Sequence, residues 1–155
     1  EMSASLVGSE MCIRDSSQAM RSREIHRTYQ AFALGETAAS GTIDAPIARL
    51  NGSLIQRTVD FASGERSVTH YRTLAHCSVF SHLELNLETG RTHQIRVHMA
   101  YIGHPLLGDT LYNKTPGTFP RQALHSASLS FVHPITGEPL NFHAPLPEDM
   151  QNLLT

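Results

Sequence analysis

The sequence has few of the features that mark secreted, membrane-spanning or metal-binding proteins. Its two cysteines, Cys12 and Cys77, lie far apart and form no CxxC pair, which argues against a disulfide framework and a thiolate zinc site. No apolar run approaches the roughly 18 residues that a membrane-spanning helix needs. The first residues, EMSASLVGSEM, lack the basic start and apolar centre of a secretory signal. These absences favour a cytoplasmic protein.

The remaining composition is ordinary for one globular domain. The chain has 155 residues, of which 40% are hydrophobic and 17% charged, and this is enough for a single core. With 12 Lys and Arg against 14 Asp and Glu, it lacks the overall basic field of many nucleic-acid-binding proteins. Lys114 is the only lysine. The other cations are therefore arginines, whose planar fork suits phosphate and carboxylate groups.

The 10 histidines form no recognisable set of metal ligands. His93 and His98 are five positions apart and would point to different sides of a helix, and there is no HExxH motif. His70, His76 and His82 recur at a regular spacing, but the stretch CSVFS interrupts them. The pattern predicts solvated or hydrogen-bonding histidines and no metal site.

Several segments have the composition of β-strands. In the clearest one, HLELNLETG at 82–90, Leu83, Leu85 and Leu87 alternate with polar residues, which predicts one dry and one wet face. The other expected strands are 26–34, 57–61, 67–76, 126–134 and 140–145, with an edge strand or loop at 41–50 because it contains a proline.

The period changes to that of a helix after Gly90. Ile95, Met99 and Ile102 fall at i, i+4 and i+7, Thr92 is the expected N-cap, and Gly103 suits the C′ position. A short helix is also expected at the end, with Pro147 at N1 and a stripe of Met150, Leu153 and Leu154. The whole pattern predicts a mixed α/β (α+β) fold, mainly antiparallel sheet with flanking helices.

The segment LETGRTHQIRVH concentrates positive charge at the expected start of the first helix. His93 and Arg96 would share a helix face beside the apolar stripe, while Arg91 and Thr92 would lie where unpaired backbone N–H groups favour anions. The segment could hold phosphate, or Arg96 could orient a catalytic carboxylate, or the charges could simply solvate a helix end. The residues alone leave these three interpretations open.

The longer stretch LETGRTHQIRVHMAYIGHPLLGDTLY resembles the C-terminal signature of the RluA-type pseudouridine synthases, which isomerise uridine in structured RNA. The resemblance continues in REIHRTYQAFALG, GTIDAPIAR, SVTHYRTL and RQALHSASLSFVHPITGEPLNFHAPLP, and covers roughly residues 18 to 155. It is most similar to the D-type enzymes that act on large-subunit ribosomal RNA. The resemblance implies the C-terminal part of that catalytic fold and structured RNA, ribosomal RNA above all, as partner.

The resemblance also implies roles for individual residues. Tyr29 would stack against the target base, and Arg96 would pair with the catalytic aspartate; a core tyrosine is the structural alternative for Tyr29. Arg91, Thr92 and His93 would contact RNA phosphates or buttress the loop. The family breaks the uracil–ribose C–N bond, turns the base over and rebonds it through carbon, without a metal or an organic cofactor.

The sequence departs from the family pattern upstream of Tyr29. It contains no HRLDxxTSG-like motif, which carries the catalytic aspartate in the family, and Asp15 in IRDSSQ lacks the flanking residues, so no nucleophile is assigned. We therefore expect 18–155 to be the C-terminal portion of a synthase, inactive alone. The strand at 82–90 would then lack neighbours and expose an apolar edge. The alternatives are a non-catalytic RNA-binding remnant and an interaction module with the same fold.

Residues 1–17 fit nothing in the family pattern. The peptide SLVGSEMCIRDS is similar to a stretch that precedes unrelated truncated proteins when adapter sequence is translated with a gene. We expect this leader to be artefactual or disordered, the alternative being a natural but unusual leader.

Overall fold

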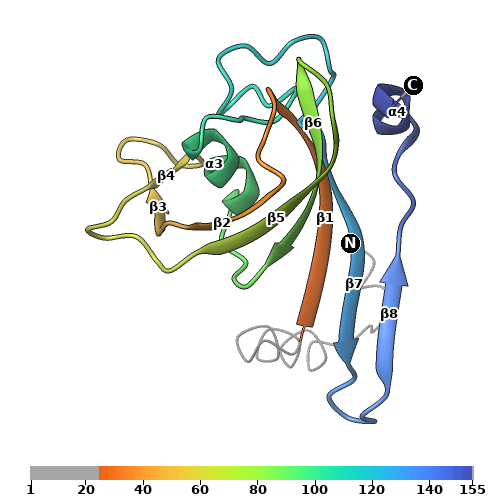
Figure 1. The fold of residues 1–155 in the computed structure, drawn as a ribbon. Helices are drawn as coiled ribbons and strands as arrows, with labels where there is room; N and C mark the ends of the chain where they lie inside the picture. Colours follow the sequence, from red (N-terminus) through yellow and green to blue (C-terminus); the bar gives the residue numbers. More distant parts are fainter. Residues whose placement is uncertain (1–24, 155) are drawn as a thin grey trace.

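The computed structural model describes residues 25–154, so the predicted leader 1–17, with Asp15, lies outside the described residues. Within this range, strands form a six-stranded antiparallel sheet in the order β2-β5-β6-β1-β7-β8 (Figure 1). They are β1 (Ile25–Leu34), β2 (Ser40–Asp44), β5 (Val68–His76), β6 (Phe80–Leu87), β7 (Leu124–Val132) and β8 (Pro139–His143). A small second sheet pairs β3 (Ile47–Arg49) with β4 (Arg57–Val59).

The helices are α3 (Gln94–Tyr101), α4 (Glu148–Gln151) and the 3-10 helix η1 (Asn152–Leu154). The predicted fold class, mainly antiparallel sheet with flanking helices, is thus confirmed. None of the helices in residues 25–154 is long and apolar enough to cross a membrane.

β6 lies inside the large sheet. Leu83 pairs with Ala31 of β1 on one side and with Thr73 of β5 on the other. Leu83 and Leu85 are fully buried, which confirms the predicted dry face. The expectation that this strand would expose an apolar edge is wrong, because β1 and β5 occupy both of its hydrogen-bonding sides.

α3 covers one face of the sheet on the side where the β3–β4 pair lies (Figure 1). Its residues Ile95 and Met99 are buried in one cluster with Leu83, Leu85 and the small side chains of β1. Burial of side chains of this size contributes roughly 1.5–3 kcal/mol each. Gly103 has a φ of +90° directly after the C-cap, as its predicted C′ position requires. The predicted apolar stripe is confirmed.

The opposite face of β1 packs against a second cluster. Phe32 points away from α3 and contacts Leu107, Ala123 and Met150 of α4, and α4 lies on the far side of the sheet from α3 (Figure 1). The predicted terminal stripe is only partly correct, because Leu154 is half exposed. Pro147 is the N-cap with extended backbone, one position before its predicted place.

The proline-containing segment and the closing hairpin form as the sequence predicts. Pro46 separates β2, which is an edge strand, from β3. β7 and β8 pair as a hairpin across the predicted turn, in which Gly137 has a φ of +75°. The connection from α3 to β7 is long and contains Asp109 and Tyr112, which belong to the candidate site.

Gly108 in that connection has no room for a side chain. Its φ is +74°, and an added Cβ would lie 1.8 Å from the carbonyl oxygen of Arg121. Gly117 has a similar φ of +80°, but an added Cβ there would meet nothing within 4 Å. The two glycines share a backbone conformation and differ in the space around them.

We predict that Gly108→Ala lowers the free energy of unfolding by about 3 kcal/mol or more, from left-handed backbone strain combined with backbone overlap. Gly117→Ala, which adds the strain alone, should cost about 1–2 kcal/mol. Urea titration monitored by circular dichroism measures both values. Equal losses for the two variants would contradict the close approach of Gly108 to Arg121.

Candidate functional site

Arg96 and Asp109 form a two-pronged ion pair between α3 and the connection that follows it. Arg96 Nε donates to Asp109 Oδ2 at 3.0 Å, and Nη2 donates to Oδ1 at 2.8 Å. The Asp109 side chain is fully buried and that of Arg96 is 14% exposed. The backbone N–H groups of Leu111 and Tyr112 also donate to Oδ1, at 3.1 and 3.2 Å. The buried charge is therefore satisfied by hydrogen bonds as well as by its ion pair.

Opposing effects act on the pKa of Asp109. Burial raises it, but the hydrogen bonds and charge of Arg96, with the two backbone N–H groups, outweigh burial and hold the pKa below its ordinary value. The carboxylate is therefore ionised at neutral pH, and the guanidinium of Arg96 is fixed in one orientation.

Tyr112 lies against this pair and connects it to His93. The Arg96 guanidinium is 5.1 Å from the centre of the Tyr112 ring, within cation–π range. The Tyr112 hydroxyl accepts the backbone N–H of Arg57 at 2.8 Å and lies 2.7 Å from His93 Nδ1. Burial is the main cause that raises the pKa of Tyr112 and lowers that of His93, which the charges of Arg96 and Arg57 lower further. Both groups are thus neutral at pH 7, and a hydrogen bond joins the hydroxyl to Nδ1.

His93, not Thr92, is the N-cap of α3, which corrects the prediction. His93 has a φ of +58°, in the left-handed region, and its side chain makes no capping hydrogen bond. This conformation costs a non-glycine residue roughly 1–3 kcal/mol. Its hydrogen bond and edge-on ring contact with Tyr112 offset that cost. The local sequence favoured Thr92 because threonine is a common N-cap. The observed start of α3 at His93 is instead accompanied by contacts with Tyr112, which is remote in the sequence.

Gln94 fixes the turn before α3. Its Oε1 accepts hydrogen bonds from Thr89 Oγ1 at 2.7 Å and from the backbone N–H of Arg91 at 3.0 Å. Its Nε2 donates to the carbonyl oxygen of Val68 at 3.0 Å and to Thr69 Oγ1 at 2.9 Å. This buried amide ties the loop to β5 and sets where the following residues point.

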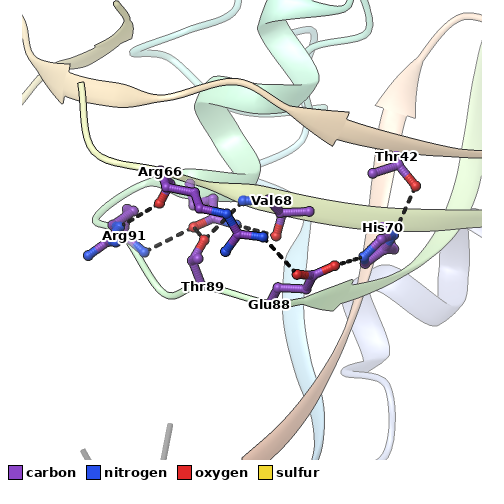
Figure 2. Close-up of polar contacts among 8 residues, drawn as sticks. Thr42, Arg66, Val68, His70, Glu88, Thr89 and Arg91 are labelled. Carbon is purple, nitrogen blue, oxygen red and sulfur yellow. Dashed lines mark hydrogen bonds and ion pairs between the residues drawn. The ribbon is translucent and has the colours of Figure 1, made fainter. Parts of the chain in front are cut away.

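Arg91 lies at the surface beside this turn (Figure 2). Its Nε donates to the carbonyl oxygen of Arg66 at 3.0 Å, and its Nη1 lies 3.6 Å from Glu65. Arg66 in turn pairs with Glu88, which also contacts His70 (Figure 2). Arg91 and Thr92 line a hollow of about 440 Å³, whereas His93 faces Tyr112. The predicted RNA-contacting trio is therefore divided between two places.

Tyr29 is on β1 beside an irregularity of the sheet. Thr28 pairs with Ser128 and Tyr29 with Ser126, so β7 has one extra residue, Ala127, at this point. Such a bulge re-aims the neighbouring side chain. Tyr29 is partly buried against the α3-side core cluster and lines a pocket of about 570 Å³ formed by β1, β7 and the end of β8. The described lining of this pocket does not include Arg96.

Sequence reasoning did not assign roles to Asp109, Tyr112 and His98. His98 is fully buried, with hydrogen bonds of 2.8 Å to Thr69 and to the Ala45 carbonyl, and burial lowers its pKa. A signal existed, because His98 lies three positions after Ile95, inside the apolar stripe. Asp109 lies in LLGDTLY, within the stretch that carries the family resemblance, and this was a signal for it. No feature of the neighbouring sequence identifies Arg96 as its partner. Within residues 25–154, no three potential metal ligands lie together.

Comparison with known proteins decides the family. A family profile described as RNA pseudouridylate synthase matches residues 9–101. The chain belongs to the RNA pseudouridylate synthase family. The profile match begins inside the segment 1–17, and the family boundary at residue 18 stays a prediction. Arg96 and its neighbours on α3 fall within the matched range.

Curated relatives in this family are highly similar over half their length. The chain is 50% identical over 139 residues to the uncharacterized RNA pseudouridine synthase YjbO of Bacillus subtilis, covering 89% of the chain and 49% of the relative. It is 47% identical over 149 residues to ribosomal large subunit pseudouridine synthase D of Vibrio cholerae, and 44% identical over 151 residues to that of Escherichia coli. These alignments cover 86% and 88% of the chain, and 45% and 46% of the relatives. The chain thus spans about half the length of the curated relatives it matches.

Solved structures agree with this family assignment. The structure of human RNA pseudouridylate synthase domain containing 1 superimposes with a TM-score of 0.75 at 25% identity, covering 88% of this chain and 61% of that one. Human RNA pseudouridylate synthase domain containing 4 has a TM-score of 0.75 at 20% identity, covering 94% and 67%, and shows likeness of fold.

We predict that Asp109→Asn lowers the free energy of unfolding by about 3 kcal/mol at pH 7, because Arg96 loses its buried counter-charge. Asp149→Asn, which weakens the partly exposed pair with Arg121, is the matched control and should cost at most about 1 kcal/mol. Urea titration measures both.

The pH dependence of the Asp109 contribution follows from its lowered pKa. Its stabilisation is present above the unfolded pKa of about 3.9 and is lost as pH falls through the lower folded value. The stability gap between wild type and Asp109→Asn should therefore narrow below about pH 4. A gap that stays constant down to pH 2 would contradict the ion pair.

Proposed function

We propose that residues 18–155 form the C-terminal portion of the catalytic domain of a cytoplasmic RNA pseudouridine synthase that acts on uridine in large-subunit ribosomal RNA. The support is the family match together with the relatives named ribosomal large subunit pseudouridine synthase D. The reaction class is isomerisation, in which the glycosidic C–N bond breaks and a C–C bond forms to the same base. In this proposal, it needs no metal or organic cofactor.

The observation that carries the proposal is the way Arg96 is held. Its fork with Asp109 uses Nε and Nη2, while a guanidinium has five N–H donors in a fixed plane. The remaining donors on Nη1 are able to pair with a second carboxylate. We assign that second carboxylate to the nucleophilic aspartate of the family's HRLDxxTSG-like motif, which is absent from this chain. Asp109 would then act as a positioning residue, because it orients Arg96 toward the nucleophile.

Tyr29 is assigned to the target base. Extrusion of a uridine from its stack costs a few kcal/mol, and an aromatic ring that stacks on the extruded base offsets part of this cost. The bulge beside Tyr29 and the pocket that it lines support this role. The segment that carries the nucleophilic aspartate would have to contact both this pocket and Arg96, so that all three belong to one site. Arg91 and Thr92 would contact phosphate, while His93 would hold the loop through Tyr112.

We predict that the 155-residue chain alone forms no pseudouridine, because neither Tyr29 nor Arg96 supplies the nucleophilic step. A chimera that joins the preceding half of Escherichia coli ribosomal large subunit pseudouridine synthase D to residues 18–155 should restore it. The assay incubates each protein with unmodified large-subunit ribosomal RNA and maps pseudouridine by chemical adducts and reverse-transcription stops. Product from the chain alone would disprove the assignment of the missing nucleophile and lead to a test of Asp15→Asn.

An inactive chimera would favour the alternatives with other functions. A non-catalytic RNA-binding remnant predicts RNA affinity that falls with salt, whereas a protein-interaction module predicts none. Fluorescence anisotropy with labelled ribosomal RNA fragments separates these two outcomes.

We predict that Arg96→Lys in the chimera lowers kcat by about 100-fold or more, because lysine keeps the charge but loses the planar fork that holds two carboxylates. RNA affinity should change less than turnover. Arg72→Lys, at an exposed pair with Glu84, is the control and should leave kcat unchanged. A wild-type kcat in the Arg96→Lys chimera would remove Arg96 from the catalytic residues.

A further inference from the structure

The hollow beside Arg91 carries positive charge on a chain whose net charge is negative. Its charged and hydroxyl-bearing lining residues come from the β3–β4 pair, the following loop and the turn before α3: Arg49, Arg57, Ser63, Glu65, Arg91 and Thr92. Three arginines against one glutamate leave a net formal charge of +2, whereas the whole chain carries −2. A local field of this sign attracts anions.

Two of these arginines lie directly opposite each other. Arg49 of β3 pairs with Arg57 of β4, so both side chains project from the same face of the hairpin. Like charges at such positions are destabilising unless an anion lies between them. Among residues 25–154, neither guanidinium has a carboxylate partner, while most other arginines of this range do. These two arginines thus carry positive charge without a carboxylate partner among the described residues.

The third arginine and the hydroxyl of Thr92 complete a site for a tetrahedral anion. Arg91 is oriented by the carbonyl of Arg66, and its contact with Glu65 is long, at 3.6 Å, to a carboxylate that is 74% exposed. Glu65 is thus free to turn toward solvent when a stronger anion enters. Thr92 is an exposed hydroxyl donor at the rim, whereas the Ser63 hydroxyl already donates to Asp60 at 2.7 Å.

The hollow is physically connected to Arg96. The backbone N–H of Arg57 donates to the hydroxyl of Tyr112. The ring of the same tyrosine makes the cation–π contact with the Arg96 guanidinium. On the other side, Thr92 is followed in sequence by His93, which contacts the same hydroxyl. Tyr112 therefore links the lining of the hollow to Arg96.

We propose that Arg49, Arg57 and Arg91 form a subsite for a backbone phosphate of RNA, beside the nucleotide that reaches Arg96. This inference rests on the proposed function, since RNA supplies the phosphate. Guanidinium groups bind phosphate through two parallel N–H bonds, so converging arginines hold it in a fixed position. The subsite would set the register of the strand without reading its sequence.

The test compares two double variants that remove the same charge. Arg49→Gln/Arg57→Gln removes two positive charges from the hollow. Arg72→Gln/Arg121→Gln removes two arginines elsewhere, one exposed and one partly exposed, which pair with Glu84 and Asp149. Urea titration first confirms that each folds. Binding of a short fluorescein-labelled RNA hairpin with uridines in its loop is then measured by anisotropy at several potassium chloride concentrations.

The hollow variant should lose about 10-fold or more in affinity at low salt, and the slope of log affinity against log salt should become shallower by about 1. The control variant should stay close to wild type. An equal loss in both variants, no loss in the hollow variant, or no binding of the hairpin by the wild-type chain would each overturn the subsite.

These outcomes are separable from those of the proposed function. If the chimera forms pseudouridine but the hollow variant binds like wild type, the subsite is wrong and the proposed activity stands. If the hollow variant loses affinity but the chimera is inactive, the subsite stands and the proposed activity is wrong.

Discussion

The buried pair of Arg96 and Asp109 is the interaction on which the site depends. A charge in the core is tolerated only with a counter-charge and satisfied hydrogen bonds, so burial of Asp109 requires α3 and the connection to β7 to meet in one arrangement. That requirement fixes Tyr112 against the guanidinium, and Tyr112 in turn holds His93 in its left-handed conformation. The start of α3 at His93 is thus stabilised by Tyr112, which follows the helix in the sequence.

Periodicity predicted the elements whose residues face a single core. The alternating leucines of β6 and the stripe through Ile95 and Met99 are properties of neighbouring residues, and burial acts on them directly. The sequence could not show that β6 has two partners, because pairing joins segments that are remote along the chain. The same limit applies to the site. Family resemblance assigned a role to Arg96, which stays a prediction, but did not assign Asp109 as its partner. No short-range rule relates a helix residue to a loop carboxylate thirteen positions on.

Hydrogen bonds connect the two sides of the candidate site, the Arg96 cluster and the basic hollow. The β3–β4 hairpin contributes Arg57, whose backbone holds the Tyr112 hydroxyl while its side chain lines the basic hollow. Gln94 ties the turn carrying Arg91 to β5 through four hydrogen bonds. A short set of polar contacts thus links the two sides. Rigid support of this kind would suit the proposed RNA-binding role of the site.

The position of β1 in the sheet also has a consequence for the order in which the molecule is assembled. β5 and β6 are consecutive and close a local hairpin, but β1 completes its hydrogen bonding only with β7, where Arg27 pairs with Leu129 near the opposite end of the described residues. Contacts between remote segments form slowly because a long loop must close first. During synthesis, one edge of β1 therefore stays unpaired until β7 has left the ribosome. The pocket lined by Tyr29 needs β7 as well, so it is among the last features to form.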